Sequence, residues 1–229
     1  MRSSKLKIVV AILILSSLFC LGNSPFISEK TKLEEVIASI QKKYRKIDSI
    51  EAKFIQRNFI APLNQFREFK GKLFLQRPHL FAMEVTSPEY QRLVFDGQFF
   101  WVYTANNNQA VKSLVAPEFF KHPLINLLTT IAELKKHFSI SLTETGPDQD
   151  YSLKLTLRTP EKEIRTVSLT VKRKGFQVKE LTIYYESGNY TQLALMDIKE
   201  NPDISKEHFL FLPPLGTEIV ENPAPITHP

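Results

Sequence analysis

The chain has 229 residues, 43% of them hydrophobic and 24% charged, which is enough to bury one sizeable core. Its formal net charge is +6, but three positive charges fall within the first 22 residues. The remaining 207 residues carry only +3, which gives a nucleic-acid-binding function little support. The single cysteine, Cys20, lies in the same short segment, so the rest of the chain uses neither disulfides nor thiol chemistry.

Residues 1–22 have the pattern of a secretory signal peptide. Arg2, Lys5 and Lys7 precede an apolar stretch that runs to Leu21, and small residues stand at the positions that a signal peptidase reads before Asn23. We therefore expect export and cleavage near residue 22. Two alternatives stay open: retention of the segment as a membrane anchor, and acylation of Cys20 as in a lipoprotein.

The first element expected after the signal is an amphipathic helix. Apolar residues recur at helical spacing with lysines and glutamates between them, so one stripe should be buried. The stripe consists of Leu33, Val36, Ile37, Ile40, Tyr44 and Ile47.

From Ile50 onward the hydrophobic period changes to two, which is typical of strands. The expected strands are Ile50–Ile60, Phe66–Gln76, Leu80–Thr86, Gln91–Phe95, Gln98–Thr104, Gln109–Val115, Phe138–Thr145, Tyr151–Thr159, Glu163–Arg173, Gln177–Glu186 and Asn189–Lys199. Short turns join most of them, so neighbours should be antiparallel. About eleven strands are too many for a flat sheet, and they predict a mainly β fold with helices, in which one sheet curls. We assign residues 23–221 to this single domain and residues 222–229, with three prolines, to an extended surface tail.

The fifth predicted strand is apolar on both of its faces. Asp96-Gly97 favours a tight hairpin turn before it, because glycine accepts a positive φ. In a strand, Phe99, Trp101 and Tyr103 point to one face and Phe100 and Val102 to the other. Antiparallel sheets usually leave one face to water, so something must cover the second face here.

A helical interval, residues 123–137, separates the sixth and seventh predicted strands. Pro123 suits a helix start, because its missing N–H costs nothing there. An apolar stripe follows, made of Leu124, Ile125, Leu127, Leu128, Ile131, Leu134 and Phe138. The stripe fits either a core helix that plugs the curled sheet or a movable lid over its concave face.

Residues that carry catalysis are scarce in this chain. Its five histidines include no pair at the spacing of zinc ligands on one helix. A Gly-x-Ser-x-Gly elbow and a phosphate-binding glycine loop are both missing from the sequence. We therefore predict a protein that is not an enzyme and uses no cofactor or metal, although an enzyme with a dispersed site stays open as an alternative.

A series of short motifs runs along the chain: Phe54-x-Gln56, Gly71-x-Leu73-x-x-x-Arg77-Pro78-x-x-Phe81, Pro88, Leu93-Val94-Phe95-Asp96-Gly97, Trp101-x-Tyr103, Gln109 and Phe209-x-Phe211-x-Pro213-Pro214-x-Gly216. Together these motifs resemble the LolA family, the periplasmic carriers of outer-membrane lipoproteins. Each motif is short, and their order and spacing from about Ile47 to Val220 carry the resemblance. The chain departs from the family at Met83, where a tryptophan is common, and over residues 116–136, which match only in character.

The resemblance implies an incomplete, strongly curved antiparallel barrel with helices over an apolar concave face. It implies that Arg77 holds a lid formed by Leu124, Leu127, Leu128 and Ile131. The acyl-chain cavity would be lined by Phe54, Leu73, Leu75, Phe81, Met83, Phe99, Trp101 and Tyr103. We favour Trp101 inward, because an exposed tryptophan between Phe and Tyr would promote aggregation.

The same resemblance implies the partners of the protein. Acylated lipoproteins would be the cargo, an inner-membrane ABC transporter the donor and an outer-membrane protein the acceptor. The carrier itself would be a soluble periplasmic monomer that does not bind nucleic acid. Two alternatives share the fold: a membrane-anchored acceptor that uses Cys20, and a regulatory module that senses lipid or lipoprotein.

Overall fold

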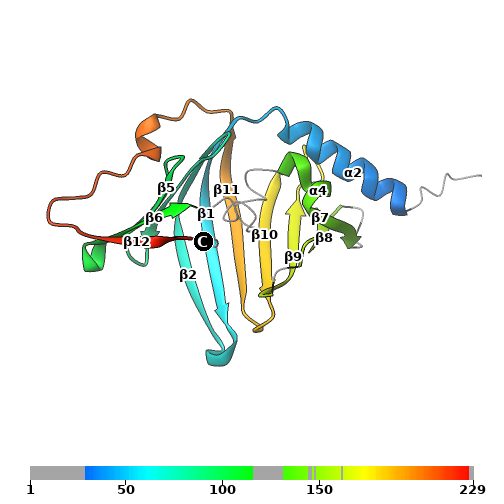
Figure 1. The fold of residues 1–229 in the computed structure, drawn as a ribbon. Coiled ribbons are helices and arrows are strands. Elements are labelled where there is room, and N and C mark those ends of the chain that lie inside the picture. The colour runs from blue at the N-terminus through cyan, green and yellow to red at the C-terminus, as the bar shows by residue number, and fades with distance from the viewer. Residues whose placement is uncertain (1–28, 116–130, 144–145, 147, 161, 227–229) are drawn as a thin grey trace, which may run out of the picture. The chain divides into compact units, whose positions relative to one another are not determined.

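The structure is a computed structural model that describes residues 29–115, 131–143, 146, 148–160 and 162–226 (Figure 1). The chain divides into two compact units, and the whole sheet lies in the second, Leu33–Pro229. Helix α2 (Glu29–Tyr44) confirms the first predicted element. Five members of the predicted stripe are buried: Val36, Ile37, Ile40, Tyr44 and, just past the end of the helix, Ile47.

The described residues form one twelve-stranded sheet, and its strands confirm all eleven predicted ones to within a few residues at their ends. The strands are β1 (Ser49–Ile60), β2 (Gln65–Gln76), β3 (Leu80–Ser87), β4 (Gln91–Phe95), β5 (Phe99–Thr104), β6 (Gln109–Val115), β7 (Phe138–Thr143), β8 (Tyr151–Leu157), β9 (Ile164–Val171), β10 (Val178–Tyr185), β11 (Tyr190–Glu200) and β12 (Glu218–Ile226). Residues 144 and 145, the predicted end of the seventh strand, lie outside the described residues.

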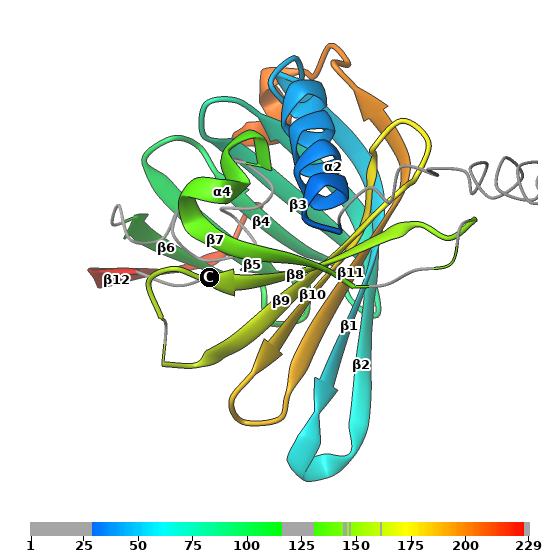
Figure 2. The same cartoon turned by 90° about the vertical axis from the view of Figure 1, so that its right-hand side faces the viewer.

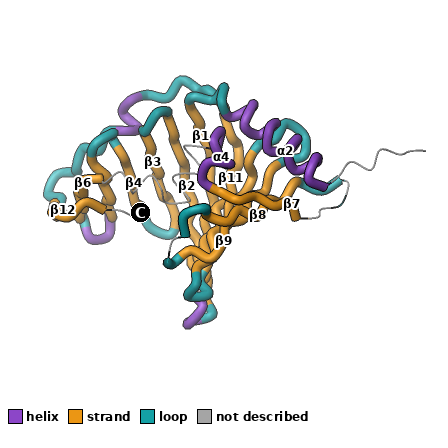
Figure 3. Tube along the Cα trace, turned by 45° about the vertical axis from the view of Figure 1, so that its right-hand side comes forward, coloured by secondary structure: helices purple, strands orange, loops and turns teal. Residues whose placement is uncertain are grey.

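The strand order is β12-β6-β5-β4-β3-β2-β1-β11-β10-β9-β8-β7. Consecutive strands pair antiparallel within β1–β6 and within β7–β11, and β1 joins these two runs by pairing with both β2 and β11. The sheet is strongly curved and stays open, since β12 and β7 lie at its two edges (Figure 3). This is the incomplete, curled antiparallel sheet that the strand count and the family resemblance predict.

One strand, β12, was not predicted. It pairs with β6 in parallel, from Glu218 opposite Gln109 to Ile226 opposite Val115. Prolines at 223 and 225 break the alternation that marks a strand, but an edge strand tolerates them on its outer side. The sheet therefore continues through residues 222–226, past the boundary that the sequence had suggested at residue 221.

The turn between β4 and β5 follows from the predicted Asp96-Gly97 pair. Gly97 adopts a φ of 102°, which side-chain-bearing residues rarely adopt. The Asp96 carboxylate accepts the backbone N–H groups of Gln98 (2.9 Å) and Phe99 (2.7 Å). This capped turn sets the register in which Trp101 lies opposite Val94 on β4.

Helix α2 covers part of the concave face of the sheet, on the same side as the short helix α4 (Leu134–His137; Figure 2). Val36, Ile40 and Tyr44 belong to one core cluster with the alternating apolar residues of β1–β3 and β8–β11. The Tyr44 hydroxyl accepts the backbone N–H of Val178 at 2.9 Å, so its one polar atom is satisfied inside the core.

Candidate ligand cavity

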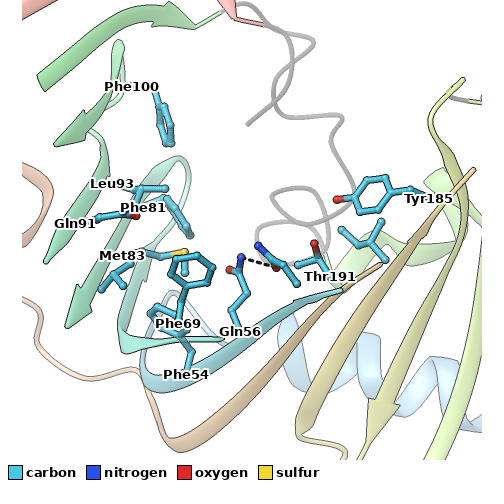
Figure 4. A pocket seen from close by; sticks show the side chains of 13 residues that line it. Phe54, Gln56, Phe69, Phe81, Met83, Gln91, Leu93, Phe100, Tyr185 and Thr191 are labelled. Carbon is cyan, nitrogen blue, oxygen red and sulfur yellow. Dashed lines mark hydrogen bonds between the residues drawn. The ribbon is translucent and has the colours of Figure 1, made fainter. Parts of the chain in front are cut away.

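A cavity of about 350 Å³ opens on the concave face beside the core (Figure 4). Its apolar lining comes from strands β1–β5 and β10: Phe54, Phe69, Phe81, Met83, Val85, Leu93, Phe100 and Ile183. These strands alternate, so each of them sends every second side chain toward the cavity. The volume falls in the range of roughly 300–1,000 Å³ that is usual for small-molecule sites.

Polar side chains gather at one side of the cavity. Gln56 and Asn58 of β1, Tyr185 of β10 and Thr191 of β11 form this polar side, and Figure 4 shows Gln56, Tyr185 and Thr191 across from Phe81 and Phe100. A fifth polar residue, Gln91 of β4, lies beside Leu93 on the aromatic side. Gln56 Nε2 donates to Asn58 Oδ1 at 3.0 Å. The cavity therefore has an aromatic wall and a wall of amides and hydroxyls.

The described lining contains no charged side chain. Burial raises the pKa of Tyr185, which keeps its phenol neutral well above neutral pH. An uncharged, mainly apolar lining suits an apolar ligand, because a charge in such a space would lose its hydration.

The structure brings five of the eight predicted cavity residues to the concave side. Phe54, Phe81 and Met83 line the cavity. Leu73 and Leu75 are fully buried in the core cluster that contains those three residues. They support the cavity from the core and are absent from its described lining.

The other three predicted cavity residues lie on the opposite face, so the inward orientation of Trp101 was wrong. Phe99, Trp101 and Tyr103 alternate with Phe100, which lines the cavity. The Trp101 ring lies 5.3 Å from that of Phe211, and the Tyr103 ring lies 5.5 Å from it. Residues Ile204–Phe211, with the 3₁₀ turn η5 (Lys206–Phe209), cover this convex patch and shield it from water.

Polar contacts also hold residues Ile204–Phe211 against the convex patch. Arg92 Nη2 donates to the carbonyl oxygens of Glu207 (3.1 Å) and His208 (3.3 Å). The His208 ring stacks on Phe74 with centroids 4.0 Å apart. The second face of β5 is therefore covered by residues Ile204–Phe211, which come from the C-terminal part of the chain.

Five apolar lining residues escaped the sequence prediction: Phe69, Val85, Leu93, Phe100 and Ile183. Two of them had a local signal, because Phe69 shares a face of β2 with Leu73 and Val85 shares a face of β3 with Met83. Val85 follows Phe81 and Met83 on the same face of β3, and Phe100 is the partner of Phe95 across the hairpin. Choosing the correct face of β5 would have found Phe100.

Arg77 borders a second cavity of about 480 Å³ at the end of β2. Its backbone N–H donates to the Asp48 carbonyl at 2.8 Å. The other described lining residues are Gln41, Arg45, Ala132, Glu133, Lys135 and Lys136. Arg77 therefore faces the end of the helical interval in which a lid was predicted.

The predicted lid residues are placed only in part. Leu124, Leu127 and Leu128 lie outside the described residues. Ile131 begins the 3₁₀ turn η4 (Ile131–Glu133), is 3% exposed and packs in the main core cluster. The described end of the interval is thus a 3₁₀ turn followed by the four-residue helix α4, where the sequence had predicted one continuous helix to residue 137.

Among the residues described, none of the helices combines the length and the apolar character needed to span a bilayer. Within the same residues, no three His, Cys, Asp or Glu side chains come close enough together to hold a metal ion. Cys20 lies outside them.

Comparisons with known proteins agree with the fold. A family model described as "Outer membrane lipoprotein carrier protein LolA" matches residues 45–212. An outer-membrane lipoprotein carrier protein of Alkalilimnicola ehrlichii is 24% identical over 95% of this chain and 96% of its own length. One from Coxiella burnetii is 23% identical over 94% and 98%. A crystal structure of an uncharacterized conserved protein from Thermus thermophilus shares the fold, with a TM-score of 0.52 at 13% identity over 83% of this chain and 99% of that one.

Proposed function

The chain belongs to the LolA family of outer membrane lipoprotein carrier proteins, and on this premise we propose that its concave-face cavity shields the acyl chains of lipoproteins during transfer between membranes. The observation that carries the proposal is the cavity itself, with its aromatic wall and uncharged lining. The family name describes a carrier of lipoproteins, and the proposed function includes no catalytic step.

The energetics explain why such a carrier is needed. Each CH₂ moved from water to an apolar site is worth ~0.8 kcal/mol, so one sixteen-carbon chain represents on the order of 12 kcal/mol. A carrier must offset most of this cost and still release its cargo. Phenylalanine, leucine and methionine side chains suit that task, because they pack against a featureless chain without demanding hydrogen bonds.

A charge placed in the lining tests the cavity. In the proposed carrier, Leu93→Glu abolishes binding of a fluorescent fatty acid, because the carboxylate would lose its hydration when the acyl chain enters. Leu210→Glu is the matched control, since Leu210 is 54% exposed and lies outside the described lining of the cavity. Equal binding by both variants and the parent protein would show that ligand does not occupy this space.

We assign Arg77 the role of a latch. Its guanidinium offers a fork of donors beside the described end of the helical interval, and hydrogen bonds to backbone carbonyls there would hold a lid closed. Such a latch is worth about 1.5–3 kcal/mol, which is enough to bias a lid and small beside the burial of an acyl chain. The lid would be the segment of Leu124, Leu127, Leu128 and Ile131.

Release of cargo tests the latch. Arg77→Leu should fold and load normally, and it should hand cargo on more slowly, because the empty closed state is no longer favoured. The measurement is the rate at which a fluorescent lipopeptide leaves the protein for acceptor vesicles. Arg45→Leu is the control, because Arg45 borders the same cavity from the other side. A normal transfer rate for Arg77→Leu would remove the latch from the mechanism.

The proposed route runs through the periplasm, from an inner-membrane ABC transporter to an outer-membrane acceptor. Extraction of acyl chains from a bilayer is uphill or near neutral, so a donor that hydrolyses ATP would have to drive loading. Mass spectrometry of the exported protein separates the soluble carrier from the anchored acceptor. A free N-terminus near Asn23 supports the carrier, and diacylglyceryl on Cys20 supports the acceptor.

A further inference from the structure

Four aromatic side chains form a row across four strands, on the face of the sheet opposite the cavity. Phe59 pairs with Phe66 on β2 and with Tyr190 on β11, and Tyr190 pairs with Tyr184 on β10. The ring centroids lie 5.0 Å apart for Phe59–Phe66, 5.1 Å for Phe59–Tyr190 and 5.8 Å for Tyr184–Tyr190. These four residues are called the aromatic row below.

The aromatic row reaches the surface at Phe66, and its other three members, Phe59, Tyr184 and Tyr190, are half-buried. Phe66 is 58% exposed, and Leu63 in the turn beside it is exposed to the same degree. Isolated surface apolar residues are ordinary, but contiguous aromatic surface marks a site of interaction. On the convex patch, by contrast, Phe211 packs on Trp101 and Tyr103, and neither ring is as exposed as that of Phe66.

The chain presents the aromatic row at a projecting tip. Pairing of β1 with β11 ends at Phe59, whereas pairing with β2 continues to Ile60 and Gln65 before the 3₁₀ turn η1 (Ala61–Leu63). The hairpin therefore extends past its neighbours (Figures 1 and 2). The Ala61 N–H donates to Asn189 Oδ1 at 2.9 Å, which ties the tip to the β10–β11 turn and fixes its orientation.

The charges of the hairpin itself are mainly positive. The hairpin between residues 57 and 70 carries Arg57, Arg67 and Lys70 against a single acid, Glu68. Glu68 already pairs with both Arg57 (2.7 Å) and Lys70 (2.9 Å). The tip thus combines exposed aromatic and aliphatic groups with an excess of cations, which is the combination that suits the headgroup region of an anionic bilayer.

We propose that the β1–β2 hairpin tip is a membrane contact, in which Leu63 and the aromatic row enter the interface of a bilayer that contains anionic phospholipid. The aromatic rings lie at headgroup depth, and Arg57 and Arg67 meet lipid phosphates. Neither the contact nor its test requires a cargo in the cavity.

The contact has a consequence for the cavity, and this part rests on the proposed function. Asn58, Tyr185 and Thr191 line the polar side of the cavity, and each is the chain neighbour of a residue in the aromatic row. The row and the polar wall are therefore the two faces of one stretch of sheet. A tip held in the interface brings this rim to the membrane surface, where an acyl chain would cross between bilayer and cavity.

Vesicle co-sedimentation of the purified protein without cargo tests the contact. We expect binding to vesicles of phosphatidylethanolamine and phosphatidylglycerol, weaker binding in high salt, and little binding to phosphatidylcholine alone. The double variant Leu63→Ser/Phe66→Ser should bind roughly tenfold more weakly, since two exposed apolar groups are lost. Arg67→Gln should weaken binding about fivefold.

The matched control is Leu215→Ser, which removes a fully exposed leucine, at 103% exposure, from the loop before β12. Equal loss of vesicle binding in this control and in the double variant would overturn the assignment to the tip. Unchanged vesicle binding of the double variant would also overturn the proposal. If that variant loses only transfer from the donor transporter, the tip contacts a protein instead, and the bilayer proposal is wrong.

A second measurement covers the case in which the double variant does not fold. Phe66→Trp in a Trp101→Phe background places the only tryptophan of the chain at the tip. Its emission should shift to shorter wavelength when phosphatidylglycerol vesicles are added, and an unshifted emission would contradict insertion. Fatty-acid binding by these variants is expected to stay normal, so failure of the tip and failure of the cavity give different results.

Discussion

Strands β1, β10 and β11 are covered by packed side chains at one end and border a cavity at the other. At one end, Tyr44 and Ile131 pack over Ile50 of β1, Val178 and Leu181 of β10, and three apolar residues of β11: Leu193, Leu195 and Ile198. A gap of only about 20 Å³ remains there. This region is called the covered end.

Farther along, β1, β10 and β11 border the cavity of about 350 Å³ with Phe54, Ile183 and Thr191. This region is called the hollow end. Aliphatic side chains dominate the covered end, whereas the hollow end carries phenylalanines, Met83 and uncharged polar groups. The same three strands supply both ends, so a core differs from a binding site here in whether Tyr44 and Ile131 pack above the strands.

Truncation of a leucine should separate the two ends most clearly. Leu181→Ala at the covered end should lower the free energy of unfolding by about 2–5 kcal/mol, because a close-packed site cannot collapse around the lost atoms. Leu93→Ala at the hollow end should cost about 1 kcal/mol, since Leu93 already borders open space. Urea unfolding followed by far-UV circular dichroism measures both. Equal losses would mean that the hollow end is packed in solution.

The alternation of apolar residues and the turn residues between the alternating runs were sufficient to predict eleven strands, although β2 and β11 bury residues over only part of their length. The alternation could not reveal which face of β5 lines the cavity. Both faces of that strand are apolar, and the choice depends on Phe209 and Phe211, which are about a hundred residues away in the chain. A contact of such sequence separation leaves no mark on the local pattern.

The family resemblance supplied Phe54, Phe81 and Met83, and the structure places all three in the cavity. It did not supply the polar wall, since amides at alternate positions of a strand also fit a solvated edge. Strand β12 was missed because its two prolines mimic a tail. In each case the missing information was the position of another strand or loop.

High pH should weaken the covered end. Burial, the largest cause, raises the pKa of Tyr44 to about 12 from an ordinary value of 10.0. The folded state thus holds this proton more tightly than the unfolded chain, so its contribution is complete below pH 10 and is lost as the pH rises toward 12. The loss should be on the order of 2 kcal/mol.

The Tyr44→Phe variant isolates the contribution of the Tyr44 hydroxyl to this pH dependence of stability. It lacks the hydrogen bond to Val178 and should be less stable than the parent at neutral pH by about 1 kcal/mol. Between pH 10 and 12 it should lose less stability than the parent protein. Parallel decline of parent and variant in urea unfolding across this range would show that another group titrates. At the hollow end we expect no such pH dependence, so fatty-acid binding at pH 9 should match binding at pH 7.

Enlarging a side chain should have opposite consequences at the two ends. Leu181→Phe overpacks the covered end and should cost about 1–3 kcal/mol of stability, with fatty-acid binding unchanged. Leu93→Phe extends into the cavity, so it should cost less than about 1 kcal/mol and weaken binding of a long-chain fatty acid severalfold. Unfolding and binding measured on the same preparations compare them. Unimpaired binding by Leu93→Phe would place the ligand elsewhere.

The smallest expected effect concerns the ion pair that links the two helices on the concave side. Lys135 of α4 donates to Glu34 of α2, and the two side chains are 44% and 52% exposed. Solvent screens such a pair, so Glu34→Gln should lower stability by no more than about 0.5 kcal/mol, and salt should erase the difference. Glu35→Gln, which changes the adjacent exposed carboxylate, is the control. A loss above about 2 kcal/mol for Glu34→Gln alone would mean that this contact, and not the apolar packing of Tyr44 and Ile131, holds the cover on the covered end.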